Sequence, residues 1–445
     1  MNFDKIGLHV PEILLPNKDT DLTKWSVVAC DQYTSQPDYW NEVKEIADGE
    51  PSSLNVIFPE VYLEDDDTSE RITNINSSMQ KYLDDNILEA MPNKGFVLVD
   101  RKTSQAPSRK GLVVAIDLEH YDFNKGSQTL IRATEGTIVD RLPPRVRVRQ
   151  DAAIEMPHIM VLIDDPEKTV IEPLFDNNPT EIYDVELMMN SGQVKGYAID
   201  DPKQIQQVAD ALEKLASPEV FESKYNITDD AHKAPLLYAM GDGNHSLATA
   251  KAIWEKRKHQ LGSADTTNEK SRYALVELVN IHDEGLEFEP IHRAIFNVSS
   301  KHLLEEMYDF YPHRCKVYRS DSEAEMKQQC LEAVREERHI LPFIDHIGYG
   351  WVQINEPEFT LELATLELFL EDYLPDVDGK IDFIHGDDIL KDISVKPDSM
   401  GFFLPPITKD SLFKTIIFDG VLPRKTFSMG EADEKRFYLE ARKIK

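Results

Sequence analysis

The sequence predicts a mixed α/β or α+β fold, and three observations support this prediction. The composition is that of a folded globular protein, with 41% apolar and 29% charged residues. Apolar runs of strand length alternate with segments whose apolar residues recur with a period near 3.6. These strands and helices interleave without the regular βαβ rhythm of a doubly wound sheet. The length of 445 residues suggests two or three domains, which we place at residues 1–125, 126–262 and 263–445.

The first region combines short strands with two helices. A buried strand is expected at residues 25–30 and a short helix at 37–47. Residues 69–90 place their apolar side chains on one helical face, which predicts a second, longer helix. Two apolar runs of strand length follow at 95–100 and 111–117, with a polar loop between them.

The remaining two regions continue the same alternation of strands and helices. The expected strands are 157–163, 169–171, 235–240, 272–280, 346–354 and 414–418. The expected helices are 201–216, 244–258, 322–337, 364–373 and 431–443.

The charge and the cysteines limit the classes of function and the compartment. The formal net charge of −32 argues against a nucleic acid or an anionic membrane as partner, because both are bound by excess Lys and Arg. Cys30, Cys315 and Cys330 form no CxxC pair, so neither a disulfide framework nor a zinc site is indicated. The first residues lack signal-peptide architecture, and no apolar run approaches the ~20 residues that span a bilayer. A soluble protein of the reducing cytoplasm is expected.

The segment Met240-Gly-Asp-Gly-Asn-His-Ser246 is the strongest candidate for a chemical centre. It joins an expected strand to an expected helix through two glycines, which permit a sharp turn and close approach of a ligand to the backbone. The helix N-terminus then offers unpaired N–H groups and a positive dipole end, so the turn is interpreted as a phosphate site. In the alternative interpretation, Asp242 or Asn244 merely caps the helix. The candidate residues are Gly241, Asp242, Gly243, Asn244, His245 and Ser246.

A second candidate is an arginine-rich stretch that contains one glutamate. Glu135, beside Thr137, lies among cationic residues, so its carboxylate should stay ionised and could act as a base. Arginine suits phosphate and carboxylate because its planar fork binds them through two hydrogen bonds. Three of the arginines alternate with valines, and the competing interpretation for these three is a strand that faces water. The five arginines are Arg132, Arg141, Arg145, Arg147 and Arg149.

Weaker candidates lie elsewhere in the chain. His292 and Arg293 follow a proline after a strand, although a structural histidine is the competing interpretation of His292. Arg424 and Lys425 form a basic pair that could reach a phosphate or could be a surface turn. Residues 29–33 end an expected strand with polar side chains, a common position for ligand contacts. The histidines lack zinc-ligand spacing, so a zinc enzyme is not expected.

Several of these segments, in this order, resemble a bacterial family known as domain of unknown function 1015. The resemblance is based on residues 131–141, 240–250, 290–293, 383–386 and 423–427. The family is similar to the ParB/sulfiredoxin-like fold and, within it, to ADP-dependent free-serine kinases. The resemblance therefore implies a ParB-like phosphate-binding core at 126–262, with large elaborations on both sides.

The serine kinases carry an Asp-Gly-His-His-Arg turn that binds nucleotide phosphate and an upstream His-Glu pair whose Glu acts as base. Asp242, Gly243 and His245 match that turn, whereas Asn244 and Ser246 replace its first His and its Arg. Glu135 matches the upstream Glu. The resemblance implies that Glu135, Asp242 and His245 are catalytic, and that Asp242 orients Mg²⁺ or the acceptor.

The implied function is phosphoryl transfer on a small hydroxylated or phosphorylated metabolite. Serine or phosphoserine is the expected substrate, in the kinase or the phosphatase direction, with Arg132 and Arg141 as substrate clamps. Mg²⁺ and ADP or ATP are the implied cofactors, and zinc, haem and flavin are not expected. The alternative is a non-catalytic ParB-like nucleotide-binding regulator. The sequence leaves the oligomeric state open, a homodimer included.

Overall fold

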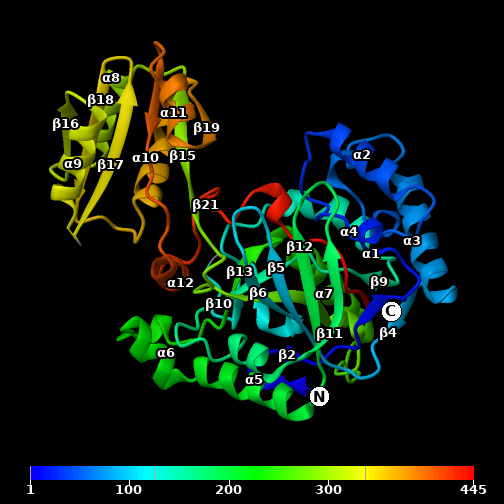
Figure 1. Cartoon of the computed structure of the whole chain (residues 1–445). Helices are drawn as coiled ribbons and strands as arrows, with labels where there is room; N and C mark the ends of the chain where they lie inside the picture. The colour runs from blue at the N-terminus through cyan, green and yellow to red at the C-terminus, as the bar shows by residue number, and fades with distance from the viewer. Residues whose placement is uncertain (1, 125, 336) are drawn as a thin grey trace. The chain divides into compact units, whose positions relative to one another are not determined.

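The computed structural model describes residues 2–124, 126–335 and 337–445 and confirms a mixed α/β fold (Figure 1). The chain divides into two compact units. The first comprises Met1–Glu287 together with Gly430–Lys445, and the second comprises Phe288–Met429. The three regions expected from the sequence stay a prediction, and the main sheet of the first unit contains strands from each of them.

A mixed sheet of eleven strands forms the centre of the first unit. Its main path runs β11-β12-β5-β6-β14-β10-β13-β8-β7, and β1 and β2 continue from β6. Most neighbours are antiparallel, but β10 pairs with β14, and β8 with both β13 and β7, in parallel. The strands are β1 (Asn2–Phe3), β2 (Leu8–His9), β5 (Phe96–Lys102), β6 (Arg109–Asp117), β7 (Tyr121–Asp122), β8 (Ile131–Arg132), β10 (Met160–Ile163), β11 (Thr180–Glu186), β12 (Gln193–Ile199), β13 (Tyr238–Asp242) and β14 (Tyr273–Asn280).

Both faces of this sheet are buried, as the alternation along β5 shows. Phe96 and Leu98 belong to a core shared with helices α5 and α7, whereas Val97 and Val99 belong to a core shared with α2 and α3. Successive side chains of a strand point to opposite faces, so an unbroken apolar run indicates a strand covered on both sides. The helices are α1 (Leu22–Trp25), α2 (Pro37–Ala47), α3 (Thr68–Asp84), α4 (Leu142–Arg149), α5 (Pro202–Leu215), α6 (Pro218–Tyr225) and α7 (Asn244–Leu261).

The C-terminal segment of the first unit corrects a sequence prediction. The helix expected at 431–443 is wrong: a 3₁₀ turn, η9 (Ala432–Glu434), is followed by extended chain and by β22 (Arg442–Lys443), which pairs with β9 (Ile154–Glu155). Phe437, Leu439 and Ala441 stand at alternate positions and enter the apolar core, with Tyr438 and Glu440 between them. A period of two, rather than the helical period, therefore governs the segment.

The charged residues of the same segment form a buried ionic network. Arg436 pairs with Glu277 of β14 and with Glu440, and Glu440 also accepts a hydrogen bond from the Tyr183 hydroxyl. Arg442 pairs with Glu155, which also binds Arg149. Buried charges persist only when they are paired and hydrogen-bonded, so this network fixes where the C-terminal segment crosses the sheet.

Four further expectations differ from the structure. Residues 414–418 lie in the helix α12 (Lys409–Phe418), which Thr408 and Ser411 cap reciprocally, and not in a strand. Residues 169–171 form no strand and precede the 3₁₀ helix η6 (Glu172–Asn177). Residues 145–149 belong to the helix α4 instead of a strand. At 25–30, α1 ends at Trp25, and Val28 makes an isolated bridge to Phe437.

A sheet of seven strands organises the second unit, in the order β16-β18-β17-β20-β15-β19, with β21 paired to β15. Its strands are β15 (Glu289–Phe296), β16 (Cys315–Ser320), β17 (Arg338–Asp345), β18 (Gly348–Asn355), β19 (Lys380–His385), β20 (Ser399–Phe402) and β21 (Phe427–Ser428). Its helices are α8 (Ser300–Phe310), α9 (Glu323–Ala333), α10 (Glu362–Val377), α11 (Asp387–Ser394) and α12. A short pair, β3 (Leu14–Pro16) and β4 (Leu88–Ala90), lies in the first unit.

Among the described residues, no helix has both the length and the apolar character that crossing a bilayer requires.

The buried network around Arg436 gives the first prediction. The substitution Arg436→Ala leaves Glu277 and Glu440 buried without their shared cation, so we expect the free energy of unfolding to fall by about 3–5 kcal/mol. Chemical denaturation followed by circular dichroism measures this change. The matched control is Arg147→Ala on α4, where the exposed side chain should change the stability by less than about 0.5 kcal/mol. Equal stability of the two variants would show that the network does not hold the segment.

Candidate functional site

Parallel pairing of β8 with β13 places the two best sequence candidates at one edge of the sheet. Ile131 lies opposite Tyr238, and Arg132 lies opposite Ala239. Because the two strands run in the same direction, the chain leaves both of them at the same edge. Residues 133–138 therefore emerge beside the turn at 241–246.

The turn itself has the geometry of an anion cradle. Gly243 adopts φ +80° as the N-cap of α7, and its N–H donates to Asp242 Oδ1 (2.9 Å). No side chain among the described residues caps this helix. The N–H of Ser246 donates to the main-chain oxygen of Gly243 (3.0 Å), and this 18-residue helix has its positive dipole end at the turn.

Two polar contacts join the turn to the segment after β8. Asn244 Nδ2 donates to Thr134 Oγ1 (3.4 Å), and the N–H of Ile138 donates to His245 Nε2 (3.4 Å). Glu135 is half-buried and lies in the chain between these two contacts, directly after Thr134. The structure thus brings the segment that carries Glu135 together with Asn244 and His245.

Two buried polar atoms without a hydrogen-bond partner belong to the turn and to the segment that carries Glu135. Within the described residues, Asn244 Oδ1 and Thr137 Oγ1 are both buried and have no hydrogen-bond partner. Such atoms are rare in folded proteins, because each costs the desolvation of a polar group. A ligand that offers a donor to the Asn244 amide and an acceptor to the Thr137 hydroxyl would satisfy both.

Lys435 is a candidate residue that the sequence prediction missed. Its Nζ lies 3.2 Å from Asp242 Oδ2, and both side chains are partly shielded from solvent. Lys435 directly precedes Arg436, so the buried network of the C-terminal segment carries it to the turn. The helix predicted at 431–443 does not place Lys435 at the turn. No local pattern connects Lys435 with a turn almost two hundred residues earlier.

Ser246, also in the first turn of α7, contacts a chain of polar side chains. Ser246 Oγ lies 2.6 Å from His158 Nε2, and His158 Nδ1 lies 2.9 Å from the Tyr438 hydroxyl. The Tyr438 oxygen also accepts the N–H of Cys30 (3.1 Å). The sequence analysis predicts ligand contacts at residues 29–33, but it names neither His158 nor Tyr438 as a candidate.

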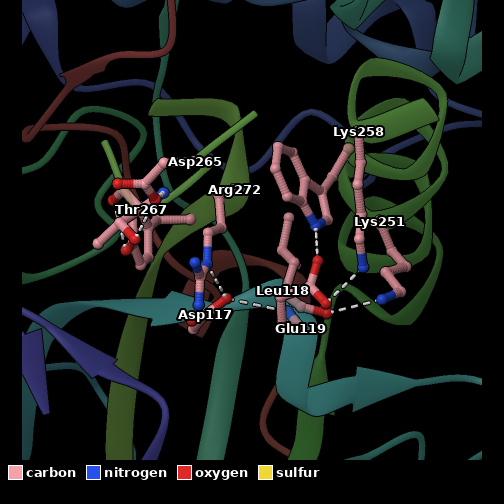
Figure 2. A network of polar contacts seen from close by, with 10 residues as sticks. Asp117, Leu118, Glu119, Lys251, Lys258, Asp265, Thr267 and Arg272 are labelled. Atoms are coloured by element: carbon pink, nitrogen blue, oxygen red, sulfur yellow. Dashed lines mark hydrogen bonds and ion pairs between the residues drawn. The ribbon is translucent and has the colours of Figure 1, made fainter. Parts of the chain in front are cut away.

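A polar network holds residues 251–258 of α7 against the chain that follows β6 (Figure 2). Lys258 Nζ and Trp254 Nε1 donate to the carboxylate of Glu119 at 2.6 and 2.5 Å. Lys251 Nζ donates to the main-chain oxygen of Leu118 (2.9 Å). Burial alone would raise the pKa of Glu119, but the hydrogen bonds from Lys258 and Trp254 keep it below its ordinary value. These contacts fix the direction of α7, and therefore the position to which its N-terminus points.

Most arginines of the arginine-rich stretch bind other groups of the protein. Arg132 Nε and Nη2 donate to the main-chain oxygens of Thr129 (2.9 Å) and Ala234 (2.7 Å). Both acceptors precede their strands, so these two hydrogen bonds hold the guanidinium at the sheet edge opposite the turn, and its role as a substrate clamp stays a prediction. Burial lowers the pKa of Arg132 to about 10, which leaves it cationic at neutral pH.

The three arginines of α4 do not form a strand that faces water. Arg145 binds Glu60, Arg149 binds Glu155, and only Arg147 is exposed among them. Arg141 is exposed at the end of the 3₁₀ helix η5 (Val139–Arg141), and its role as a substrate clamp stays a prediction.

Four of the weaker candidates, His292, Arg293, Arg424 and Lys425, belong to the second unit. His292 accepts the N–H of Leu404 at Nδ1 (3.0 Å), its Nε2 lies 3.0 Å from Asp387 Oδ1, and burial lowers its pKa. Arg293 is fully buried and binds Glu367 (2.5 Å). These contacts hold both side chains within their unit, and their assignment to a phosphate stays a prediction. Arg424 and Lys425 are exposed, and their assignment to a phosphate stays a prediction.

Among the described residues, no group of three or more His, Cys, Asp and Glu side chains could hold a metal ion. Asp242 is the carboxylate of the turn, and both of its oxygens already have partners in Gly243 and Lys435. Mg²⁺ commonly binds proteins through one or two carboxylates together with substrate phosphates, so Asp242 fits such a role only alongside a bound phosphate.

The comparisons with known proteins identify the family. The family described as "Protein of unknown function (DUF1015)" matches residues 14–363. The chain belongs to this family. The matched range includes the turn at 241–246 and Glu135. No curated protein matches the chain.

Three solved structures illustrate the remote likeness of the DUF1015 chain. A conserved hypothetical protein from Pyrococcus furiosus is 11% identical, with a TM-score of 0.36, over 73% of this chain and 93% of that one. A free serine kinase in complex with AMP is 9% identical, with a TM-score of 0.38, over 75% and 92%. SbnI with a C-terminal truncation, from Staphylococcus aureus, is 8% identical, with a TM-score of 0.34, over 72% and 83%.

The positive φ of Gly243 in the turn gives the second prediction. In Gly243→Ala the new methyl group would lie 3.1 Å from Ile159 Cα, at a φ of +80° that L-residues avoid. We expect a loss of stability of about 1–2 kcal/mol from the backbone alone, and a further loss from the contact. Thermal unfolding measures both.

The matched control is Gly49→Ala, because Gly49 has φ +76° and no neighbour within 4 Å of the added methyl. Its loss should be limited to the backbone contribution. A Gly243→Ala variant as stable as Gly49→Ala would contradict the tight contact with Ile159.

Proposed function

We propose that the first turn of α7 binds the phosphate of a small metabolite and that the protein is a phosphoryl-transfer enzyme. The observation that carries the proposal is the meeting of the Gly243 turn with the segment of Glu135 through Asn244–Thr134 and Ile138–His245. Serine or phosphoserine is the proposed substrate, in the kinase or the phosphatase direction. Phosphoryl transfer needs positioning and charge neutralisation more than covalent chemistry, and this arrangement offers both.

The charges around the turn suit a phosphate. The N–H groups of the first turn of α7 supply donors and a positive dipole end. Lys435 adds a cation beside Asp242, in a chain whose formal net charge is −32. Against this acidic background, an anionic ligand is attracted only where such donors are concentrated.

In the kinase direction, the carboxylate of Glu135 takes the proton of the substrate hydroxyl. The hydroxyl oxygen then forms a bond to the transferred phosphorus, and the bond from that phosphorus to the nucleotide oxygen breaks. In the phosphatase direction, water takes the place of the hydroxyl. Mg²⁺, when bound with the phosphate, would neutralise charge on the phosphoryl group, and Asp242 is the carboxylate placed to hold it.

The orphaned polar atoms support a substrate with both donors and acceptors. The ammonium group of serine or phosphoserine could donate to Asn244 Oδ1, and the carboxylate, or the phosphate of phosphoserine, could accept from the Thr137 hydroxyl. This pairing is part of the proposal that serine or phosphoserine is the substrate.

A non-catalytic nucleotide-binding regulator is the second candidate function. The pairing of Asp242 with Lys435 favours it, because this contact occupies the one carboxylate of the turn that could hold Mg²⁺. An assay of turnover separates the enzyme from the regulator. The panel of ligands is phosphoserine, serine with ADP or ATP, and CTP, each with Mg²⁺. Tight binding of CTP, ADP or ATP without turnover would favour the regulator.

Glu135→Gln gives the third prediction. The amide keeps the size of the side chain but cannot take a proton, so we expect turnover in this panel to fall by about 10²- to 10⁴-fold while ligand binding persists. Asp140→Asn is the matched control, because Asp140 is exposed in the same segment and should leave turnover unchanged. Full activity of Glu135→Gln, or of His245→Ala, would refute this site.

Lys435→Gln gives the fourth prediction. Removal of the cation should weaken the binding of phosphoserine by about 10-fold or more, since hydrogen bonds to charged groups contribute about 1.5–3 kcal/mol. Isothermal titration calorimetry measures the affinity. Lys443→Gln, in the same C-terminal segment, serves as the control. An unchanged affinity for Lys435→Gln would remove Lys435 from the binding site.

A further inference from the structure

Ser246, His158 and Tyr438 form a connected series that the proposed function has not used. Ser246 Oγ lies 2.6 Å from His158 Nε2, and His158 Nδ1 lies 2.9 Å from the Tyr438 hydroxyl. A hydroxyl within hydrogen-bond reach of a base, which a third group orients, is the arrangement of an activated nucleophile. Ser246 also stands in the first turn of α7, beside the N–H groups proposed to hold the phosphate.

A cavity gives access to this serine. Its volume is about 130 Å³, and Ser246 and His158 both contribute to its wall. Apolar side chains such as Ile57, Phe58 and Met79 form most of the remaining lining, and Glu60 pairs there with Arg145. A serine that merely filled a core position would not open into such a space.

We propose that Ser246 is a nucleophile that takes the phosphoryl group from the donor before it passes to the acceptor. This inference rests on the proposed function and assigns it a covalent intermediate. In the first step, Ser246 Oγ forms a bond to phosphorus, the bond from phosphorus to the donor oxygen breaks, and the Ser246 proton moves to His158 Nε2. In the second step, Glu135 takes the proton of serine or water, whose oxygen forms the new bond to phosphorus. The bond from phosphorus to Ser246 Oγ then breaks, and His158 returns its proton to Oγ.

The surroundings of His158 suit the role of a base. For Nε2 to accept a proton, Nδ1 must carry the hydrogen, and the oxygen of Tyr438 can accept it. That oxygen also accepts the N–H of Cys30, and the phenol hydrogen can be directed to the Cys30 sulfur, with which it makes a hydrogen bond. Burial raises the pKa of Tyr438 well above its ordinary value, so the phenol stays protonated and Tyr438 acts as a positioning residue.

An alkyl fluorophosphonate tests the nucleophile without knowledge of the natural donor, since an activated serine displaces its fluoride. In the full chain, mass spectrometry of peptides should locate the phosphonyl group on Ser246. Ser246→Ala should lose the label, and His158→Gln should slow labelling by on the order of 100-fold. Tyr438→Phe keeps the aromatic ring and should slow the labelling less than His158→Gln does. The control Ser263→Ala, at an exposed position after α7, should be labelled like the unaltered protein.

A second experiment looks for the phosphorylated intermediate itself. The Glu135→Gln variant, incubated with Mg²⁺ and ATP, ADP or acetyl phosphate, should accumulate phosphoserine at Ser246, because its second step is blocked. Absence of both the fluorophosphonate label and phosphoserine at Ser246 in folded protein would overturn the inference.

The two proposals fail in different ways. Turnover that Glu135→Gln abolishes and Ser246→Ala leaves unchanged would refute the nucleophile and keep direct phosphoryl transfer. Labelling of Ser246 by the fluorophosphonate, with no turnover of any phosphate donor, would keep the nucleophile and refute the phosphoryl-transfer function.

Discussion

The parallel pairing of β8 with β13 is the constraint on which the candidate site depends. Two strands that run in the same direction release their chains at the same edge, so Thr134 and Ile138 meet Asn244 and His245. If the two strands were antiparallel, the segment of Glu135 would emerge at the opposite edge. The network of Glu119, Lys251 and Lys258 then fixes the direction of α7, and the helix dipole is held where that segment passes.

The C-terminal segment completes the surroundings of the turn from the other side. Its buried ion pairs hold it in extended form across the sheet, and this conformation delivers Lys435 to Asp242 and Tyr438 to His158. Buried ion pairs contribute little net stability compared with apolar packing, but the loss of one partner is strongly destabilising. The same contacts that order the end of the chain therefore position two of its polar side chains beside the turn.

Local patterns in the sequence were sufficient for some parts of this arrangement and not for others. The strand, the turn and the helix at 235–258 follow from an apolar run, two glycines and one apolar helical face, all within a short stretch. The segment after residue 434 is extended and not the predicted helix, although Arg436 and Glu440 also have the i, i+4 spacing of a helical ion pair. Lys435, His158 and Tyr438 depend on pairing between distant segments, which no local signal records. Arg132 looked like a clamp for a ligand, and only the fold shows that main-chain oxygens already hold it.

The position of a bound phosphate tests the central claim most directly. A crystal structure of the full chain with phosphoserine should place the phosphate oxygens within hydrogen-bond distance of the N–H groups in the first turn of α7. The Glu135 carboxylate should face the same ligand. A phosphoserine bound elsewhere in the first unit, or a Glu135 carboxylate directed away from it, would contradict the account.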